Sequence, residues 1–459
     1  MGTICEEPKP SLLQDLKISI ENVSLVFPSQ KTERKSMFLS NIDKVLNFPV
    51  ETVHFFAAHK EFPPPLVAEK LKSRLEKLLV PYDFLAGRVR TNPENGRLEI
   101  ECNAAGIGFA LASSHYTLDD VGNLVYPNPA FGQLICKSLD SNLLESDDQP
   151  LCNVQVTSFR CGGFAIGFIT NHVTFDGLSF KIFLDNLAAA IAADGNTPLP
   201  LTPCNDRLLL ASRSPPRVDF PHFELAKFHD SNPPPVFDAT SEDLDFKVFR
   251  LTSSDIADLK EKAKAAGSSG DGGGGARIIT GFNVVTALIW RCKALSWHKE
   301  TTPNPQDRVS TLLYAVNIRP RLVPPLPVSY TGNAVLTAYA TAKCEEIEEG
   351  PFGRIVEMVW EGARRVTDEY ARSAIDWGEI YQGFPNGEFL VSSWWKLGFE
   401  EVEYPWGRPR YSCPVVFHRK DIILLFPDIQ DKNGVNVLVS LPRQQMIKFE
   451  TLFRNYLAC

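Results

Sequence analysis

The sequence predicts a mixed α/β protein made of two domains that a proline-rich crossover joins. The chain has 459 residues, too many for one ordinary hydrophobic core, so two domains of about 200 residues each are expected. Strand-like and helix-like hydrophobic patterns occur together in each half. Residues 206–245 are dense in proline and lack sustained periodicity, so we take them as the crossover between a first domain at 1–205 and a second at 246–459.

Elements of the first half follow from local composition. The helix at 63–80 places its leucines on one face, begins with prolines and ends at Pro81. The segment 164–170, FAIGFIT, is apolar on both faces, as expected of a buried central strand, and a turn at Cys161–Gly163 leads into it. Other predicted strands of this half lie at 24–29, 50–60, 96–102 and 152–160.

The second half opens with a strand followed by a capped helix, at 247–266. The glycine-rich segment 267–275 reads as a flexible connector, because no G-K-[ST] follows to make a phosphate cradle. Further helices are predicted at 280–297, 352–375 and 442–457, and a hairpin turned by Asn433-Gly434 at 421–441.

Composition excludes several classes of function. The net charge of -8 argues against nucleic acid as the main partner. The ten cysteines include no C-x-x-C pair, so no metal site is predicted. No apolar run approaches the roughly 18 residues that a transmembrane segment needs, and the N-terminal residues lack a signal-peptide pattern. We expect a soluble, cytoplasmic protein.

Two of the eight histidines lie in an H-x-x-x-D frame, His172 with Asp176 and His115 with Asp119. The spacing alone is weak evidence, and context separates the copies. His115 stands in a polar stretch typical of an exposed turn. His172 follows the buried strand at 164–170, at a strand end where α/β sheets present catalytic groups, and Gly177 comes soon after to allow an unusual backbone conformation. A histidine held there could accept a proton near neutral pH, or could simply be a satisfied core histidine.

Asp176 admits two interpretations. As a triad-like residue, it would accept a hydrogen bond from the imidazole and fix its tautomer. Alternatively, it turns away from the ring and pairs with an arginine elsewhere, holding the bend so that His172 is presented correctly. The sequence does not decide between them.

Four ordered segments resemble motifs of the plant BAHD family of acyl-CoA-dependent acyltransferases, and the match covers nearly the whole chain. NHVTFDG at 171–177 resembles its H-x-x-x-D-G motif, and DFLAGRVR at 83–90 its element after the first long helix. Residues 315–335 resemble its N-x-R-x-R…Y-x-G-N segment, and 392–409 its T-S-W…D-F-G-W-G block. The resemblance implies two chloramphenicol-acetyltransferase-like domains with a solvent channel between them, the first domain also receiving a segment near 403–428.

The same resemblance implies an enzyme that transfers an acyl group from acyl-CoA to an alcohol or amine through a ternary complex. His172 would be the general base, and the Ser392 hydroxyl and Trp394 indole would stabilise the oxyanion. Strand packing is the alternative for both. No cofactor is implied beyond acyl-CoA as co-substrate, and a monomer is expected. Thr280 and Arg277 are candidate CoA contacts, with a helix cap and a surface charge as their alternatives.

The D-F-G-W-G block differs in this chain, which has Glu403-Tyr404-Pro405-Trp406-Gly407. By resemblance its acidic residue is structural and pairs with Arg319 or Arg321. Pro405 replaces a glycine and restricts the backbone. This departure favours an alternative function, a non-catalytic family member that binds a partner in lipid or wax metabolism, whereas the intact His172 and Asp176 favour an enzyme.

Within the family, the segments 161–177 and 205–218 look most like the hydroxycinnamoyl transferases that acylate ω-hydroxy fatty acids and fatty alcohols. The predicted donor is therefore feruloyl-, coumaroyl- or caffeoyl-CoA, and the predicted acceptor is a long-chain alcohol.

Overall fold

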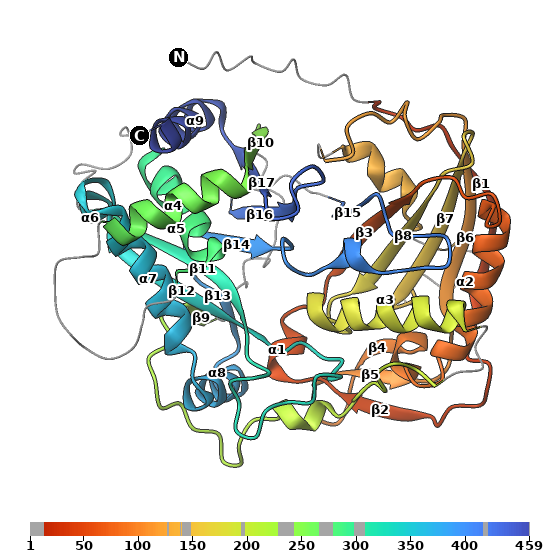
Figure 1. Ribbon diagram of the computed structural model, residues 1–459. Coiled ribbons are helices and arrows are strands. Elements are labelled where there is room, and N and C mark those ends of the chain that lie inside the picture. The colour runs from red at the N-terminus through yellow and green to blue at the C-terminus, as the bar shows by residue number, and fades with distance from the viewer. Residues whose placement is uncertain are drawn as a thin grey trace. The chain divides into compact units, whose positions relative to one another are not determined.

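The computed structural model divides the chain into two compact units, which are described separately (Figure 1). The first unit comprises Met1–Ala211, Pro327–Asn333 and Leu397–Val416, and the second comprises Ser212–Leu326, Ala334–Lys396 and Phe417–Cys459. Within these spans the structure describes residues 13–125, 128–137, 139, 148–193, 198–227, 243–265, 279–297, 308–415 and 421–458.

The first unit is built on a six-stranded sheet with the order β1-β6-β7-β8-β3-β15. Its strands are β1 (Ile18–Val26), β3 (Pro49–Phe56), β6 (Ile107–Ser114), β7 (Cys152–Phe159), β8 (Phe164–Asn171) and β15 (Tyr411–Pro414). The interior strand β8 pairs antiparallel with both β7 and β3. The predicted buried central strand is thus confirmed, as is the turn before it, where Gly162 has φ +83°.

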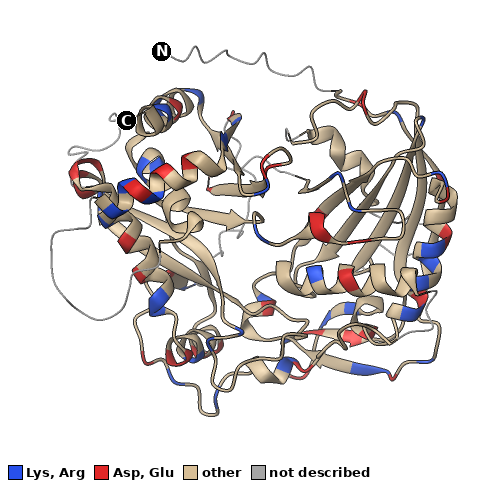
Figure 2. Cartoon of the chain, viewed as in Figure 1, with Lys and Arg blue, Asp and Glu red and all other residues tan. Residues whose placement is uncertain are grey.

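Helices α2 (Pro64–Leu78) and α3 (Gly177–Ala192) of the first unit pack against each other, and α2 also contacts β1 and β7. Prolines start α2 as predicted. Figure 2 shows charges of both signs along α2, whereas the strands of the six-stranded sheet are largely uncharged. The smaller elements of this unit are β2 (Lys35–Phe38), β4 (Arg88–Thr91), β5 (Leu98–Cys102), α1 (Asn41–Lys44), and the 3-10 turns η1 (Asp83–Ala86), η2 (Pro129–Leu134), η3 (Arg207–Leu210) and η6 (Phe399–Glu401).

The second unit has its own six-stranded sheet, with the order β10-β17-β16-β14-β11-β12. These strands are β10 (Asp245–Leu251), β11 (Val309–Asn317), β12 (Val335–Lys343), β14 (Phe389–Ser393), β16 (Ile422–Pro427) and β17 (Val435–Leu441). A separate short pair joins β9 (Leu225–Lys227) to β13 (Gly383–Pro385). Strand β14 runs parallel to both of its neighbours, β11 and β16, and the predicted hairpin of β16 and β17 is present.

Helix α5 (Gly281–Leu295) is the buried centre of the helical layer of the second unit and contacts the helices around it. Those are α4 (Ser253–Ala265), α6 (Cys344–Glu349), α7 (Phe352–Arg365) and α9 (Arg443–Ala458), and α8 (Asp368–Ile380) follows α7 in the chain. The single helix predicted at 352–375 was wrong. The Thr367 side chain accepts the backbone N–H of Tyr370, so a new helix is capped there and the pattern is two helices, α7 and α8.

The division of the chain differs in detail from the predicted boundaries. The late segment grouped with the first unit is Leu397–Val416, where 403–428 was predicted, and Pro327–Asn333 also belongs to this unit. Of the predicted crossover at 206–245, residues 228–242 lie outside the described part. Among the described helices, none combines the length and apolar character needed to cross a membrane.

Candidate active site around His172

His172 immediately follows β8, on a tight turn that fixes its backbone. Its N–H donates to the Phe48 carbonyl at 2.8 Å. The side-chain oxygen of Asn171 accepts the N–H of Val173 at 3.1 Å, and the Asn171 carbonyl accepts the N–H and hydroxyl of Thr174 at 2.9 Å and 2.6 Å. These bonds close a turn directly at the end of the central strand.

Phe175 anchors the same turn in the core. Its buried ring contacts the rings of Tyr82, Phe84, Phe180 and Phe183 at centroid distances between 5.4 and 6.2 Å. Such aromatic packing holds the turn in addition to the backbone hydrogen bonds. Within H-V-T-F-D-G the residues at 173–176 are buried, whereas His172 and Gly177 keep partial exposure.

The imidazole of His172 is a base in its neutral form. Burial lowers the pKa of His172 below the ordinary value, because the imidazolium loses solvation. Smaller influences raise the pKa: the polar groups of its own backbone and of Asn333, and the negative charges of Asp176 and Asp43. The Nδ1 of His172 is buried and makes no hydrogen bond to another described residue. The ring meets the edge of Phe48 at 5.3 Å. A lowered pKa keeps the ring unprotonated and able to accept a proton at neutral pH.

Asp176 caps helix α3, a role that the sequence analysis did not consider. Its Oδ1 accepts the N–H and the hydroxyl of Ser179, both at 2.9 Å, while Ser179 Oγ accepts the N–H of Asp176 at 2.9 Å. This capping box satisfies helix donors that would otherwise be unpaired. Asp176 also makes an interaction beyond the cap, so its use in the cap leaves the two predicted roles undecided.

Gly177 is important for close packing rather than for an unusual backbone conformation. It is the first residue of α3 and is not among the glycines with positive φ. A Cβ at this position would lie 2.6 Å from Cδ1 of Leu397. The predicted backbone role was therefore wrong: the missing side chain makes room for the late segment that joins the first unit.

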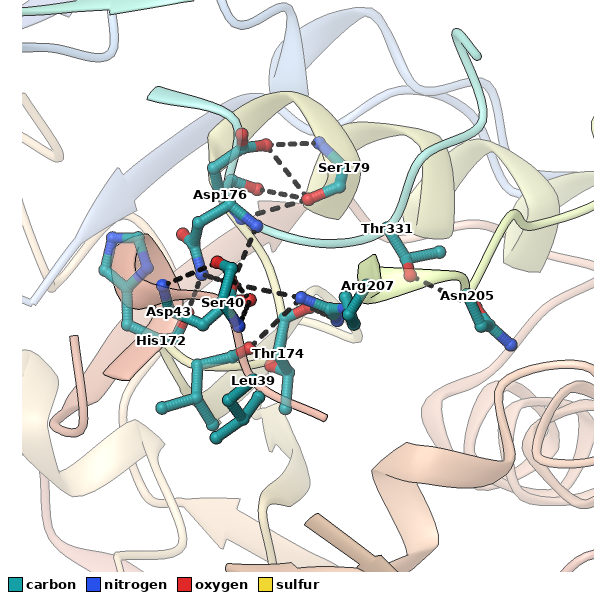
Figure 3. Close-up of polar contacts among 12 residues, drawn as sticks. Leu39, Ser40, Asp43, His172, Thr174, Asp176, Ser179, Asn205, Arg207 and Thr331 are labelled. Carbon is teal, nitrogen blue, oxygen red and sulfur yellow. Dashed lines mark hydrogen bonds and ion pairs between the residues drawn. The ribbon is translucent and has the colours of Figure 1, made fainter. Parts of the chain in front are cut away.

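A buried ion pair, Asp43 with Arg207, lies next to the His172 turn (Figure 3). Arg207 Nη1 is 3.1 Å from Asp43 Oδ1, and both side chains have 0% exposure. Arg207 also donates to the carbonyls of Val173 at 3.4 Å and Thr174 at 2.8 Å. Asn333 Nδ2 donates to Asp43 Oδ1 at 2.8 Å and to the His172 carbonyl at 2.7 Å.

The sequence analysis missed this cluster. Arg207 opens the predicted crossover and Asn333 is the last residue of the Y-x-G-N motif, yet neither was assigned a role, and Asp43 was not singled out. The three residues are separated by more than a hundred positions in each case, so no local pattern joins them. The one available signal was a helix-capping pattern at Ser40–Asp43, which is present as a capping box.

The predicted oxyanion donors lie in the second unit. Ser392 is half-buried in β14, opposite Leu424 of β16. Trp394 follows the strand, and its backbone N–H donates to the Leu425 carbonyl at 2.8 Å. Both are thus at the end of a strand with parallel neighbours. The next residue, Trp395, is buried against Gly281 and is a core residue.

The altered block 403–407 forms a well-packed turn. Tyr404 and Gly407 are joined by a hydrogen bond of 2.8 Å from the Gly407 N–H, which places Pro405 at the second position of the turn, where proline is favoured. Gly407 has φ +100°, a value that suits glycine. The rings of Tyr404 and Trp406 stack at 5.0 Å and are buried. Pro405 therefore fits this backbone.

Arg319 and Arg321, the predicted partners of Glu403, make hydrogen bonds within the second unit. The sequence analysis expected Arg319 or Arg321 beside Glu403, but the ion pair that the structure gives Glu403 is with Arg408 in the same loop. Arg321 donates to the carbonyls of Ala363 and Val366, at 2.6 Å and 3.0 Å. Arg319 is buried and donates to the Asn317 side chain at 3.4 Å.

Thr280 is the N-cap of α5, where its hydroxyl oxygen accepts the N–H of Asn283 at 3.2 Å. The helix-cap alternative is therefore present for Thr280. Arg277 lies outside the described residues.

The second H-x-x-x-D frame, His115 with Asp119, lies at the surface as predicted. His115 is exposed beside a shallow hollow that Asp15 and Lys17 also line, and the Asp119 side chain is 91% exposed.

Comparisons with known proteins agree with this architecture. Residues 16–455 match the model of the family described as "Transferase family". Acyltransferase GLAUCE of Arabidopsis thaliana is 61% identical over 460 residues, with 100% of both chains covered. Omega-hydroxypalmitate O-feruloyl transferase of the same plant is 31% identical, covering 95% of this chain and 93% of its own. The crystal structure of vinorine synthase has a TM-score of 0.71 at 23% identity, covering 94% and 96% of the chains, which shows a shared fold.

A family match over almost the whole chain, together with a relative of 61% identity, places this protein in the Transferase family, the BAHD acyl-CoA-dependent acyltransferases that its motifs resemble.

Proposed function

We propose that the protein transfers a hydroxycinnamoyl group from CoA to the hydroxyl of a long-chain alcohol or ω-hydroxy fatty acid, with His172 as general base. The observation that carries the proposal is the imidazole of His172. It is held at the end of β8, and burial keeps its pKa below the ordinary value, so it is unprotonated at neutral pH.

The proposed chemistry needs no covalent enzyme intermediate. His172 accepts the proton of the acceptor hydroxyl as that oxygen attacks the thioester carbonyl carbon. The tetrahedral intermediate carries the negative charge on the former carbonyl oxygen. Its collapse breaks the carbon–sulfur bond, and the departing CoA thiolate takes the proton from the imidazolium, which returns His172 to its starting state.

Ser392 and Trp394 remain the proposed donors to the oxyanion. A hydroxyl and an indole N–H are suitable donors; Ser392 lies near the end of β14 and Trp394 directly follows the strand. Thr280 and Arg277 remain proposed CoA contacts. An exposed N-cap such as Thr280 is compatible with an anion, since a helix N-terminus attracts negative charge. The cytoplasmic location and monomeric state also remain predictions.

The acceptor is proposed from sequence similarity. The relative named omega-hydroxypalmitate O-feruloyl transferase matches 95% of this chain, in agreement with the segments at 161–177 and 205–218. The more similar relative is named only as an acyltransferase, so the choice of acyl donor and acceptor needs a direct test.

The alternative, a family member that acts only by binding a partner, rested on the altered block at 403–407. The hydrogen-bonded turn of Tyr404–Gly407 and its buried aromatic rings give that block an ordered structure. The intact His172 turn favours the enzyme.

A substrate panel tests the proposal. Purified protein is incubated with feruloyl-, coumaroyl-, caffeoyl- and acetyl-CoA, each with 16-hydroxypalmitate, 1-hexadecanol, shikimate or putrescine, and products are identified by mass spectrometry. We expect esters from the hydroxycinnamoyl donors and the two long-chain acceptors. Turnover confined to acetyl-CoA, or to shikimate or putrescine, would contradict the substrate assignment, and no turnover with any pair would favour the binding protein.

A further inference from the structure

We propose that Asp43, Arg207 and Asn333 are positioning residues for His172, acting together as one buried assembly. The inference rests on the proposed function of His172 as the base. It assigns to these three residues the task of fixing the backbone on which the imidazole is carried, without contact with substrate.

The assembly contacts three consecutive carbonyls. The His172 carbonyl accepts from Asn333 Nδ2 at 2.7 Å, the Val173 carbonyl accepts from Arg207 Nη1 at 3.4 Å, and the Thr174 carbonyl accepts from Arg207 Nη2 at 2.8 Å. All three follow Asn171, the last residue of β8, so the sheet ladder no longer sets the orientation of these peptides. Beyond the end of β8, hydrogen bonds from the assembly orient these three peptides.

Asp43 is the centre of the assembly. Its Oδ1 accepts from Arg207 Nη1 at 3.1 Å, from Asn333 Nδ2 at 2.8 Å and from the Asn333 N–H at 3.0 Å. Its Oδ2 accepts from the N–H and hydroxyl of Ser40 at 3.0 Å and 2.7 Å. One carboxylate therefore aligns both residues that contact the His172 turn, and is itself aligned by the start of α1.

Burial makes this geometry strict. The side chains of Asp43 and Arg207 have 0% exposure, so neither charge can exchange its partner for water. Breaking one bond of such a buried pair leaves an uncompensated charge, which is strongly unfavourable. The forked guanidinium of Arg207 also fixes two carbonyls at once, which a single ammonium group does not reproduce.

The backbone at Gly332 lies close to the Arg207 guanidinium. A Cβ at Gly332 would lie 2.3 Å from Arg207 Nη1 and 2.7 Å from the Tyr330 hydroxyl. The segment before Asn333 thus passes directly against the guanidinium. A displacement of about 1 Å at a reacting group can cost about 100-fold in rate. The assembly therefore affects catalysis by holding the backbone of His172 in place, without itself contacting substrate.

The test uses Asn333→Ala, Arg207→Lys and the double variant in the full chain. Asp376→Asn is the matched control, since Asp376 is a buried carboxylate of α8 that pairs with Arg213 at 2.6 Å in the second unit. Rates are measured at a temperature at which circular dichroism shows every variant folded. We expect kcat to fall about 10- to 100-fold in each single variant, with KM for acyl-CoA changed less than about two-fold, because acyl-CoA contacts are not proposed there.

The double variant should lose no more rate than the worse single variant, because residues that act as one unit are not additive. Asp376→Asn should lower the melting temperature while kcat of the folded protein stays at the wild-type value. Unchanged kcat in Asn333→Ala and Arg207→Lys, or multiplicative losses in the double variant, would overturn the proposal.

An NMR measurement that does not depend on enzyme activity separates this inference from the proposed function. The Cε1–H signal of His172 is identified in a carbon–proton NMR spectrum by its absence in His172→Ala. It should move in Asn333→Ala and stay in place in Asp376→Asn. A wild type without acyl transfer would refute the proposed function alone, whereas an unmoved His172 signal in Asn333→Ala would refute the positioning role.

Discussion

Asp176 and Ser179 form a reciprocal capping box at the start of α3, with the carboxylate accepting two hydrogen bonds of 2.9 Å from Ser179. The same carboxylate acts on His172 through its charge, which raises the pKa of the ring against the larger effect of burial. Asp176 therefore has a measurable structural role and a measurable electrostatic role, and the two can be separated by choice of substitution.

The structural role is separated by comparing Asp176→Ala with Asp176→Asn. Alanine removes the acceptor for the Ser179 N–H, so we expect the free energy of unfolding to fall by about 0.5–2 kcal/mol. Asparagine keeps a side-chain oxygen and is itself a favoured N-cap, so the cap survives. Urea denaturation of the three proteins measures this. Equal loss in both variants would show that the charge, and not the cap, is what the fold requires.

The electrostatic role predicts a shift in the acid limb of the pH–rate profile. Rate should rise with pH through the pKa of His172 and level off above it, because the base must be unprotonated. Asp176→Asn removes a negative charge that favours the imidazolium, so the pKa of His172 falls and the limb moves to lower pH. Asp185→Asn, which removes a charge farther along α3, is the control. A limb that moves to higher pH in Asp176→Asn would contradict this.

His54 predicts a loss of stability in acid. His54 lies on β3 opposite Ser412 of β15, and its buried ring has Nδ1 2.8 Å from the Ser412 hydroxyl. Burial lowers the pKa of His54 to about 3. The unfolded chain binds a proton near pH 6.5 and the folded chain only near pH 3. The full contribution of His54 to the free energy of unfolding is therefore present above pH 6.5. It is lost as the pH falls from 6.5 towards 3, by about 1.4 kcal/mol per pH unit.

Urea denaturation at pH 7.5 and pH 5.5 measures that loss in the wild type and in His54→Gln, which cannot take up the proton. The variant is expected to be less stable at pH 7.5, yet its stability should change less between the two values. An identical pH dependence in both proteins would show that His54 is not the group responsible.

Pro405 offers a test of the altered block. Because proline suits the second position of the Tyr404–Gly407 turn, Pro405→Gly should destabilise the protein by about 0.4–1 kcal/mol, through the greater freedom of the unfolded chain. The rate of acyl transfer should stay at the wild-type value. Thermal unfolding and the substrate assay check both statements, and a more stable or more active Pro405→Gly protein would mean that proline strains this turn.

Local patterns predicted those elements whose cause is local. The prolines and leucine stripe of α2, the apolar run of β8 and the hairpin of β16 and β17 were visible in the sequence and are present. The hairpin was predicted to turn at Asn433-Gly434, whereas its connection spans residues 428–434 and closes with the Gly434 N–H on the Asp431 carbonyl. The break between α7 and α8 was missed because the Thr367 cap outweighs a hydrophobic pattern that continues through it.

The surroundings of His172 could be predicted only in part, because they are assembled from distant segments. His172 was selected from the buried strand before it, which needs only neighbouring residues. The pairing of Asp43 with Arg207 spans 164 positions, and that of Asp43 with Asn333 spans 290. No periodicity or composition links such positions, since tertiary packing alone brings them together. Gly177 likewise was assigned a backbone role, whereas the structure indicates that a side chain there would collide with Leu397, which lies far along the chain.

The most direct test of the central claim is the release of free CoA thiol by wild-type protein, His172→Ala and His115→Ala, with an active donor and acceptor pair. His115 is the matched control, because it has the same H-x-x-x-D spacing in an exposed turn. The account predicts that His172→Ala loses at least about 100-fold in rate while His115→Ala keeps the wild-type rate. A His172→Ala protein that turns over at the wild-type rate would contradict it.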